Sequence, residues 1–150
     1  MVVAAVTAAL AAGVAAIPGT AAQAAGKYGP RLVDKYVSPP VRAGATKWVK
    51  TYWTSPNDVC DVRVTVDGVP VSYPANTGTY TSFSRSADLE RGHYDYTAFR
   101  VTVPPDAAGS ITVKLSVEYT NLPSGSDMTD PECTGHRSHR STTARLFVRN

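Results

Sequence analysis

Alternation of apolar and polar residues is the feature of this 150-residue sequence that most restricts its fold. In ITVKLSVEY, residues 111–119, every second side chain is apolar and those between are polar or charged. Such a two-residue period places the apolar side chains on one face of a β-strand, as in antiparallel sheets with one wet face. CDVRVTV, residues 60–66, repeats the pattern. We find no convincing helical period after residue 30, so the sequence predicts an all-β protein.

Shorter strand candidates surround these two segments, with turn-forming residues between them. We predict them at residues 31–37, 46–53, 69–73, 79–84, 95–103 and 142–148. Asp67-Gly68 is a strong two-residue hairpin signal, which predicts that 69–73 is the return strand of a hairpin, with Pro70 marking it as an edge. Seven or eight short strands with turns between them predict an antiparallel β-sandwich.

The first 24 residues differ from the rest of the chain. VVAAVTAALAAGVAAI, residues 2–17, carries no charge and is mostly alanine, and Ala22-Gln23-Ala24 has the small-x-small pattern that signal peptidase reads. The run is shorter and less apolar than the roughly 20 residues of a membrane-spanning helix. We expect a signal peptide at 1–24 and one domain at 25–150, secreted or at the cell envelope, with no membrane span. An uncleaved alanine-rich helix is the alternative.

The charge of the chain is mildly basic, at +3. This charge is too small and too dispersed to indicate nucleic acid as a partner. After Cys133, however, the sequence has four arginines and no acid. This basic stretch suits an anionic cell wall or membrane surface, or is simply a solvated face.

Two cysteines, Cys60 and Cys133, are present. An even cysteine count in an exported chain predicts a disulfide, and here only one intrachain pairing exists. The closed loop would stabilise the fold by roughly 4 kcal/mol in the chain-entropy account.

Cys133 also begins a C-x2-H-x2-H spacing with His136 and His139. Structural zinc sites take four ligands from two separated pairs, and only one cluster exists here, with its cysteine assigned to the disulfide. On a strand, the odd separation of the two histidines would point them to opposite faces. His136 and His139 therefore remain weak metal candidates. The nearby Asp127, Asp130 and Glu132 are weak calcium candidates, because no calcium-loop motif accompanies them. We expect no cofactor.

Catalytic patterns are missing from the sequence. It contains no G-x-S-x-G, no glycine-rich phosphate loop, and no cysteine outside the expected disulfide. We therefore expect that the protein is not an enzyme.

Aromatic residues gather in TKWVKTYW, residues 46–53. Strand alternation puts Trp48 and Tyr52 on one face with Lys50, and Trp53 on the other, so one tryptophan should reach the surface. Exposed aromatic side chains on a sheet bind sugars or proteins, whereas buried ones are core. Trp48, Tyr52 and Trp53 are the candidate binding residues.

VCDVRVTVDG, YTSFSRSADLERGHYDYTAFRVTVP, ITVKLSVEYT and the closing TTARLFV, after an alanine-rich leader, resemble small secreted proteins of actinobacteria. They are also similar to immunoglobulin-like modules of bacterial surface proteins. The resemblance covers about residues 30–150, although both tryptophans precede Cys60, unlike in antibody domains. It implies an extracellular immunoglobulin-like sandwich with no site to carry over.

Two functions follow as expectations. The first is a secreted, non-catalytic module with a structural, binding or adhesion role, whose partner is an extracellular protein, a glycan or a cell-wall polymer. The alternative is a secreted inhibitor or ligand-binding protein that presents a loop at 121–141.

Overall fold

The computed structural model describes residues 28–123, 128 and 132–150, and the predicted signal peptide lies outside them. Eight strands make up the regular structure of this part of the chain. They are β1 (Arg31–Leu32), β2 (Tyr36–Arg42), β3 (Thr46–Thr54), β4 (Val59–Asp67), β5 (Val71–Ser72), β6 (Tyr94–Thr102), β7 (Ser110–Asn121) and β8 (His136–Arg149). None of the described residues forms a helix that is long and apolar enough to cross a membrane.

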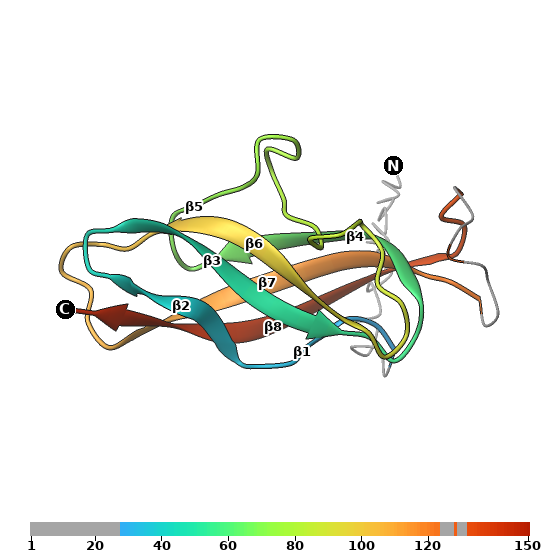
Figure 1. The fold of residues 1–150 in the computed structure, drawn as a ribbon, viewed down its shortest axis with the longest axis horizontal. Coiled ribbons are helices and arrows are strands. Elements are labelled where there is room, and N and C mark those ends of the chain that lie inside the picture. The colour runs from blue at the N-terminus through green and yellow to red at the C-terminus, as the bar shows by residue number, and fades with distance from the viewer. Residues whose placement is uncertain (1–27, 124–127, 129–131) are drawn as a thin grey trace, which may run out of the picture.

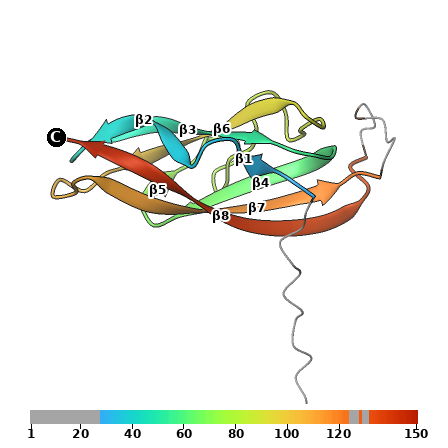
Figure 2. The same cartoon turned by 90° about the horizontal axis from the view of Figure 1, so that it is seen from below.

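The strands form two layers, which Figure 2 shows edge-on. One layer has the order β2-β3-β6-β5, with β1 paired to the end of β3, and the other has the order β4-β7-β8-β2 (Figure 1). Lettered A to G in chain order from β2, these layers correspond to the A-B-E-D and C-F-G sheets of an immunoglobulin constant-type domain. The predicted immunoglobulin-like sandwich is therefore confirmed by the strand order.

β2 belongs to both layers. Its Ser38 pairs with Lys50 of β3, whereas residues on either side pair with β8, and the register shifts between Val37 and Val41. Pro39 and Pro40 lie in this interval and have no N–H to donate to a ladder, which favours an irregularity there. The pairing of β2 with β8 is parallel. The expectation of purely antiparallel pairing is wrong at this one ladder, because a period-two pattern contains no information on the direction of a partner strand.

The core lies between the layers and is mainly aliphatic. Alternate residues of β4, β6 and β7 are buried, as the sequence pattern predicts. The largest buried side chains include Trp53, Tyr119, Phe99, Leu115 and Leu146. Each strand thus keeps its other face free for solvent or for a partner.

The predicted hairpin at Asp67-Gly68 is wrong. β5 pairs with β6 and β4 pairs with β7, so the chain crosses from one layer to the other after β4. Gly68 has a φ of 99°, and a Cβ at this position would lie 2.7 Å from the carbonyl oxygen of Thr112. The glycine therefore serves a close crossing of the backbone over β7, and not a two-residue turn.

Three other strand predictions also change. The predicted 31–37 strand is divided into β1, which ends at Leu32, and β2, which begins at Tyr36. The predicted 79–84 strand is replaced by isolated bridges, Val64 with Thr81 and Phe83 with Thr97. These bridges link β4 to β6 along the side of the sandwich opposite β2. The last strand begins at His136, six residues before the predicted start at residue 142.

Candidate binding surface

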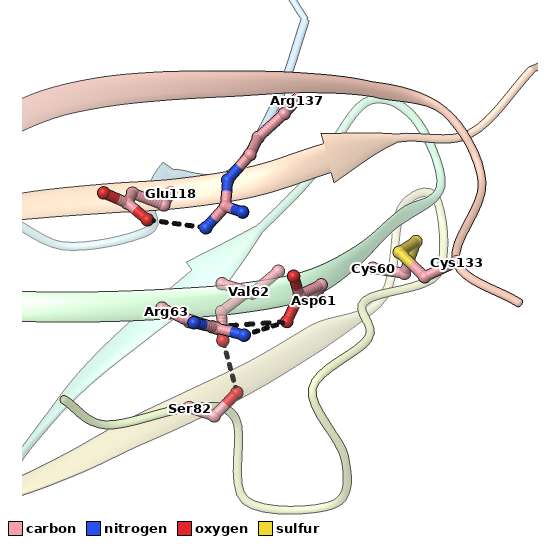
Figure 3. A network of polar contacts seen from close by, with 8 residues as sticks. All are labelled: Cys60, Asp61, Val62, Arg63, Ser82, Glu118, Cys133 and Arg137. Carbon is pink, nitrogen blue, oxygen red and sulfur yellow. Dashed lines mark hydrogen bonds and ion pairs between the residues drawn. A yellow bond between two sulfur atoms is a disulfide. The ribbon is translucent and has the colours of Figure 1, made fainter. Parts of the chain in front are cut away.

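The predicted disulfide joins Cys60 and Cys133, with Cα atoms 6.0 Å apart, and Figure 3 shows it at the start of β4. It ties the segment between β7 and β8 to β4, the neighbour of β7. Both sulfurs are oxidised, so neither is available as a nucleophile or as a thiolate ligand for a metal. The adjacent Asp61 has a φ of 50°, at a bulge in the ladder between β4 and β7.

His136 and His139 both lie on β8, where they pair with Asn121 and Glu118. Their odd separation places the two imidazoles on opposite faces of the strand. Within residues 28–123, 128 and 132–150, no three His, Cys, Asp or Glu side chains are grouped as metal ligands would be. Of the calcium candidates, Asp127 and Asp130 lie outside the described residues. The structure therefore gives His136 and His139 no shared site.

The 121–141 segment is not one loop. The ladder between β7 and β8 extends to the pair Asn121 and His136, so residues 136–141 are strand. Gly135 precedes this pair, and a Cβ there would collide with the carbonyl oxygen of Asn121. The connection that an inhibitor would present is therefore confined to 122–135.

Two arginines on the outer face of the β4-β7-β8 layer form ion pairs. The Arg63 guanidinium lies 3.1 Å from the carboxylate of Asp61, and that of Arg137 lies 2.9 Å from that of Glu118 (Figure 3). Arg63 also lies over the ring of Tyr80, 5.2 Å from its centroid. Arg137 is one of the arginines of the predicted basic stretch, so part of that charge is neutralised within the layer.

The outer face of the β3-β6 layer is different, because aromatic residues dominate it. Trp48 is 48% exposed and Tyr52 is 39% exposed, so the predicted exposed tryptophan is Trp48. Trp53 is fully buried and contributes nothing to a surface. Its indole N–H donates to the hydroxyls of Thr51 and Thr97, at 3.0 and 3.1 Å, which satisfies the polar atom inside the core.

β6 extends this surface. The register places Tyr96 opposite Tyr52 and Arg100 opposite Trp48. The rings of Tyr52 and Tyr96 have centroids 6.0 Å apart, and Tyr94 at the start of β6 is 65% exposed. We define Trp48, Tyr52, Tyr94 and Tyr96, together with Lys50 and Arg100, as the aromatic face.

Lys50 lies at the centre of the aromatic face. Its ammonium nitrogen is 3.9 Å from the centroid of the Tyr96 ring, a cation–π contact that holds the charge on the surface. Ala98 lies opposite Lys50, and its small side chain leaves room for the lysine to reach Tyr96. Among the described residues neither Lys50 nor Arg100 forms an ion pair.

A groove of about 280 Å³ borders the aromatic face beside Tyr96. Asn76, Thr77, Ser82 and Ser84 contribute to its lining. The hydroxyl of Ser82 donates to the carbonyl of Val62, and that of Ser84 donates to Asp95. These hydroxyl oxygens are thus fixed in place with lone pairs left to accept hydrogen bonds.

Sequence reasoning missed Tyr94, Tyr96, Lys50 and Arg100 as members of the site. Alternation in DYTAFRVTV, which buries Phe99 and Val101, already puts Tyr96 and Arg100 on the opposite face. What the sequence does not contain is the register that sets β6 beside β3.

No protein-family model and no curated protein matches the chain. Among solved structures, the chain is similar to PapD-like domain 7 of human CEP192, at 13% identity over 83% of this chain and 87% of that chain, with a TM-score of 0.35. It is also similar to AvmM, described as catalysing macrocyclization in alchivemycin A biosynthesis, at 11% identity over 80% and 88% of the two chains, with a TM-score of 0.32. Both scores are too low to carry an argument, so the fold assignment rests on the strand order.

Proposed function

We propose that this chain is a secreted, non-catalytic β-sandwich module with a binding or adhesion role at the cell envelope or in the medium. The alanine-rich leader supports export. The disulfide supports an oxidising compartment, because such bonds are rare in the cytosol. The absence of catalytic patterns from the sequence supports a role in binding.

The aromatic face carries the proposal. Large exposed aromatic side chains gathered on one face of a soluble domain are characteristic of an interaction surface. Trp48 and Tyr52 project from a nine-residue strand that is hydrogen-bonded along its length to β6. The side chains are therefore held on a rigid support and can meet a partner with little loss of conformational freedom.

Sedimentation with insoluble cell-wall material tests this function. The double variant Trp48→Ala/Tyr52→Ala should bind the wall at least tenfold more weakly, because binding hot spots are enriched in Trp and Tyr and removal of one costs about 2 kcal/mol or more. Phe147→Ala is the matched control, since Phe147 is 41% exposed and lies on β8.

The control should bind as the unchanged protein does, and all three proteins should have the same circular dichroism. Equal binding by the double variant and the unchanged protein would contradict the assignment of the surface. Failure of the unchanged protein to bind either wall material or polymers from the medium would contradict the function itself.

A further inference from the structure

The aromatic face has an excess of positive charge that the protein does not compensate. The outward-facing positions of β3 and β6 hold two cations, Lys50 and Arg100, and no aspartate or glutamate. On the outer face of the other layer, Arg63 and Arg137 are each paired with a carboxylate. In the part of the chain that the structure describes, Lys114 and Arg145 of that layer form no ion pair either, but they share its outer face with Asp67 and Glu118. The two layers therefore differ in what they offer to a ligand: among the described residues, the aromatic face presents its cations with no acidic residue at the outward-facing positions.

The arrangement of these groups along β3 suits a chain-like ligand. Trp48, Lys50 and Tyr52 alternate as ring, ammonium and ring over about 13 Å of strand, at roughly 3.3 Å per residue. Arg100 stands across from Trp48 and extends the same row of charge on β6. A linear polymer lying along the strands would meet flat aromatic surfaces and cations in turn.

The chemistry of the groups selects the kind of polymer. Aromatic rings stack on the apolar faces of sugar rings, while a lysine ammonium and an arginine guanidinium pair with carboxylates. A polyol-phosphate polymer supplies anions, but its backbone has no sugar rings on which the aromatic side chains could stack. Nucleic acid usually meets a denser set of cations than Lys50 and Arg100. A neutral glycan would leave the two cations without partners.

We propose that the aromatic face binds an acidic polysaccharide, a chain of sugars that carry carboxylate groups, with Lys50 and Arg100 pairing the carboxylates. This inference rests on the proposed function and names the ligand class of the same surface. Polar groups of the adjoining groove, such as Asn76, lie where they meet the hydroxyls of the bound sugars.

Affinity electrophoresis with defined polymers tests the inference. The probes are polygalacturonate, the same polymer after chemical reduction of its carboxylates to alcohols, and poly(glycerol phosphate). We expect the protein to bind polygalacturonate about 25- to 100-fold more tightly than the reduced polymer, because reduction removes the partners of both cations and each pair contributes about five- to tenfold. Binding to poly(glycerol phosphate) should be at least as weak as to the reduced polymer.

Three variants separate a specific site from diffuse attraction. Lys50→Gln and Arg100→Gln should each weaken binding to polygalacturonate by about five- to tenfold and leave binding to the reduced polymer unchanged. Lys114→Gln is the matched control, because Lys114 is an exposed lysine on the outer face of β7. It should change the affinity less than twofold. Thermal unfolding of each variant confirms that the fold is kept.

Equal affinity for the intact and the reduced polymer, or equal losses from Lys50→Gln and Lys114→Gln, would overturn the inference. So would preferential binding to poly(glycerol phosphate). If none of the three polymers binds while wall binding still depends on Trp48 and Tyr52, the acidic-polysaccharide inference fails and the proposed function stands. If the protein binds neither the polymers nor the wall material, the acidic-polysaccharide inference and the proposed function both fail.

Discussion

Trp48 and Trp53 show what alternation decides at the scale of single residues. Both lie on β3, yet one is nearly half exposed and the other is fully buried. Their odd separation predicts opposite faces, but the sequence does not tell which face is the inner one, since both carry apolar residues. Burial of Trp53 depends on hydrogen bonds to Thr51 and to Thr97, the latter on another strand. The sequence therefore predicts that one tryptophan is exposed, and only the pairing of β3 with β6 identifies it.

Tyr119 has a comparable dependence on distant residues. Its side chain is buried on β7 and its hydroxyl donates to the carbonyl of Tyr28, at 2.9 Å. A Cβ on the adjacent Gly29 would collide with the tyrosine ring, which explains the glycine there. Burial raises the pKa of Tyr119, while the charge of Arg140 and a hydrogen bond with Ser138 act in the opposite direction.

The raised pKa predicts an alkaline loss of stability. Below the ordinary tyrosine pKa, near 10, the phenol is protonated in the folded and in the unfolded state. Its full contribution to the free energy of unfolding is then present. As the pH rises further, the unfolded state loses the proton first, so the free energy of unfolding falls until the folded pKa is passed. Urea unfolding between about pH 8 and about pH 11 should show this fall.

Two variants assign the effect to Tyr119. Tyr119→Phe loses the phenolic hydrogen bond, so its free energy of unfolding should be lower at neutral pH. Because phenylalanine cannot ionise, this free energy should also fall less steeply above about pH 10. Tyr94→Phe, at an exposed position, should keep the slope of the unchanged protein. Identical slopes for Tyr119→Phe and the unchanged protein would refute the assignment.

At the scale of elements, the strands could be predicted and their partners could not. The segments with one clean apolar face, β4 and β7, appear close to the expected residues because burial of one face selects the strand period. The Asp67-Gly68 prediction failed because a hairpin-like dipeptide also suits a crossing between layers. The start of β8 at His136 was missed because HRSHRS has no apolar alternation, and it is the ladder to β7 that orders it.

Gly68 allows the crossing between the layers to be tested. Gly68→Ala introduces a side chain at a positive φ and brings its Cβ near the Thr112 carbonyl, so both strain and collision lower the free energy of unfolding. Gly78→Ala is the matched control, because Gly78 has a φ of 72° and open space around the added Cβ. We expect a loss of about 1 kcal/mol for the control from backbone strain. The loss for Gly68→Ala should be at least about 1 kcal/mol larger.

Chemical denaturation of the two alanine variants measures the difference. Equal losses would mean that the backbone around Gly68 relaxes away from Thr112, which would contradict the close crossing.

At the scale of the whole molecule, the sandwich is closed along both long sides. β2 pairs with strands of both layers on one side. On the other side, the 79–89 segment bridges β4 and β6, with Val59 also paired to Leu89. The disulfide adds a covalent link at one end. Closure leaves little exposed strand edge for β-pairing with a partner, so the outward faces of the layers become the main surfaces for recognition.

The candidate surface was predicted from the sequence only in part. Trp48 and Tyr52 followed from one strand, because alternation acts within a strand. Lys50 shares their face by the same alternation, whereas Tyr96 and Arg100 joined them through the register of β3 with β6, which depends on the packing of the whole sandwich. Charge compensation is partly a property of the assembled layers: Asp61 lies two residues from Arg63 on the same strand, but Glu118, which neutralises Arg137, comes from the neighbouring strand.

Mapping backbone amide chemical shifts during titration with short oligogalacturonides tests the central claim most directly. The account predicts saturable shifts concentrated in β3 and β6, with the indole N–H of Trp48 among the most affected, and small shifts in β4, β7 and β8. Shifts centred on the β4-β7-β8 layer, or no shifts at concentrations that saturate the intact polymer, would contradict the assignment of the aromatic face as the binding surface.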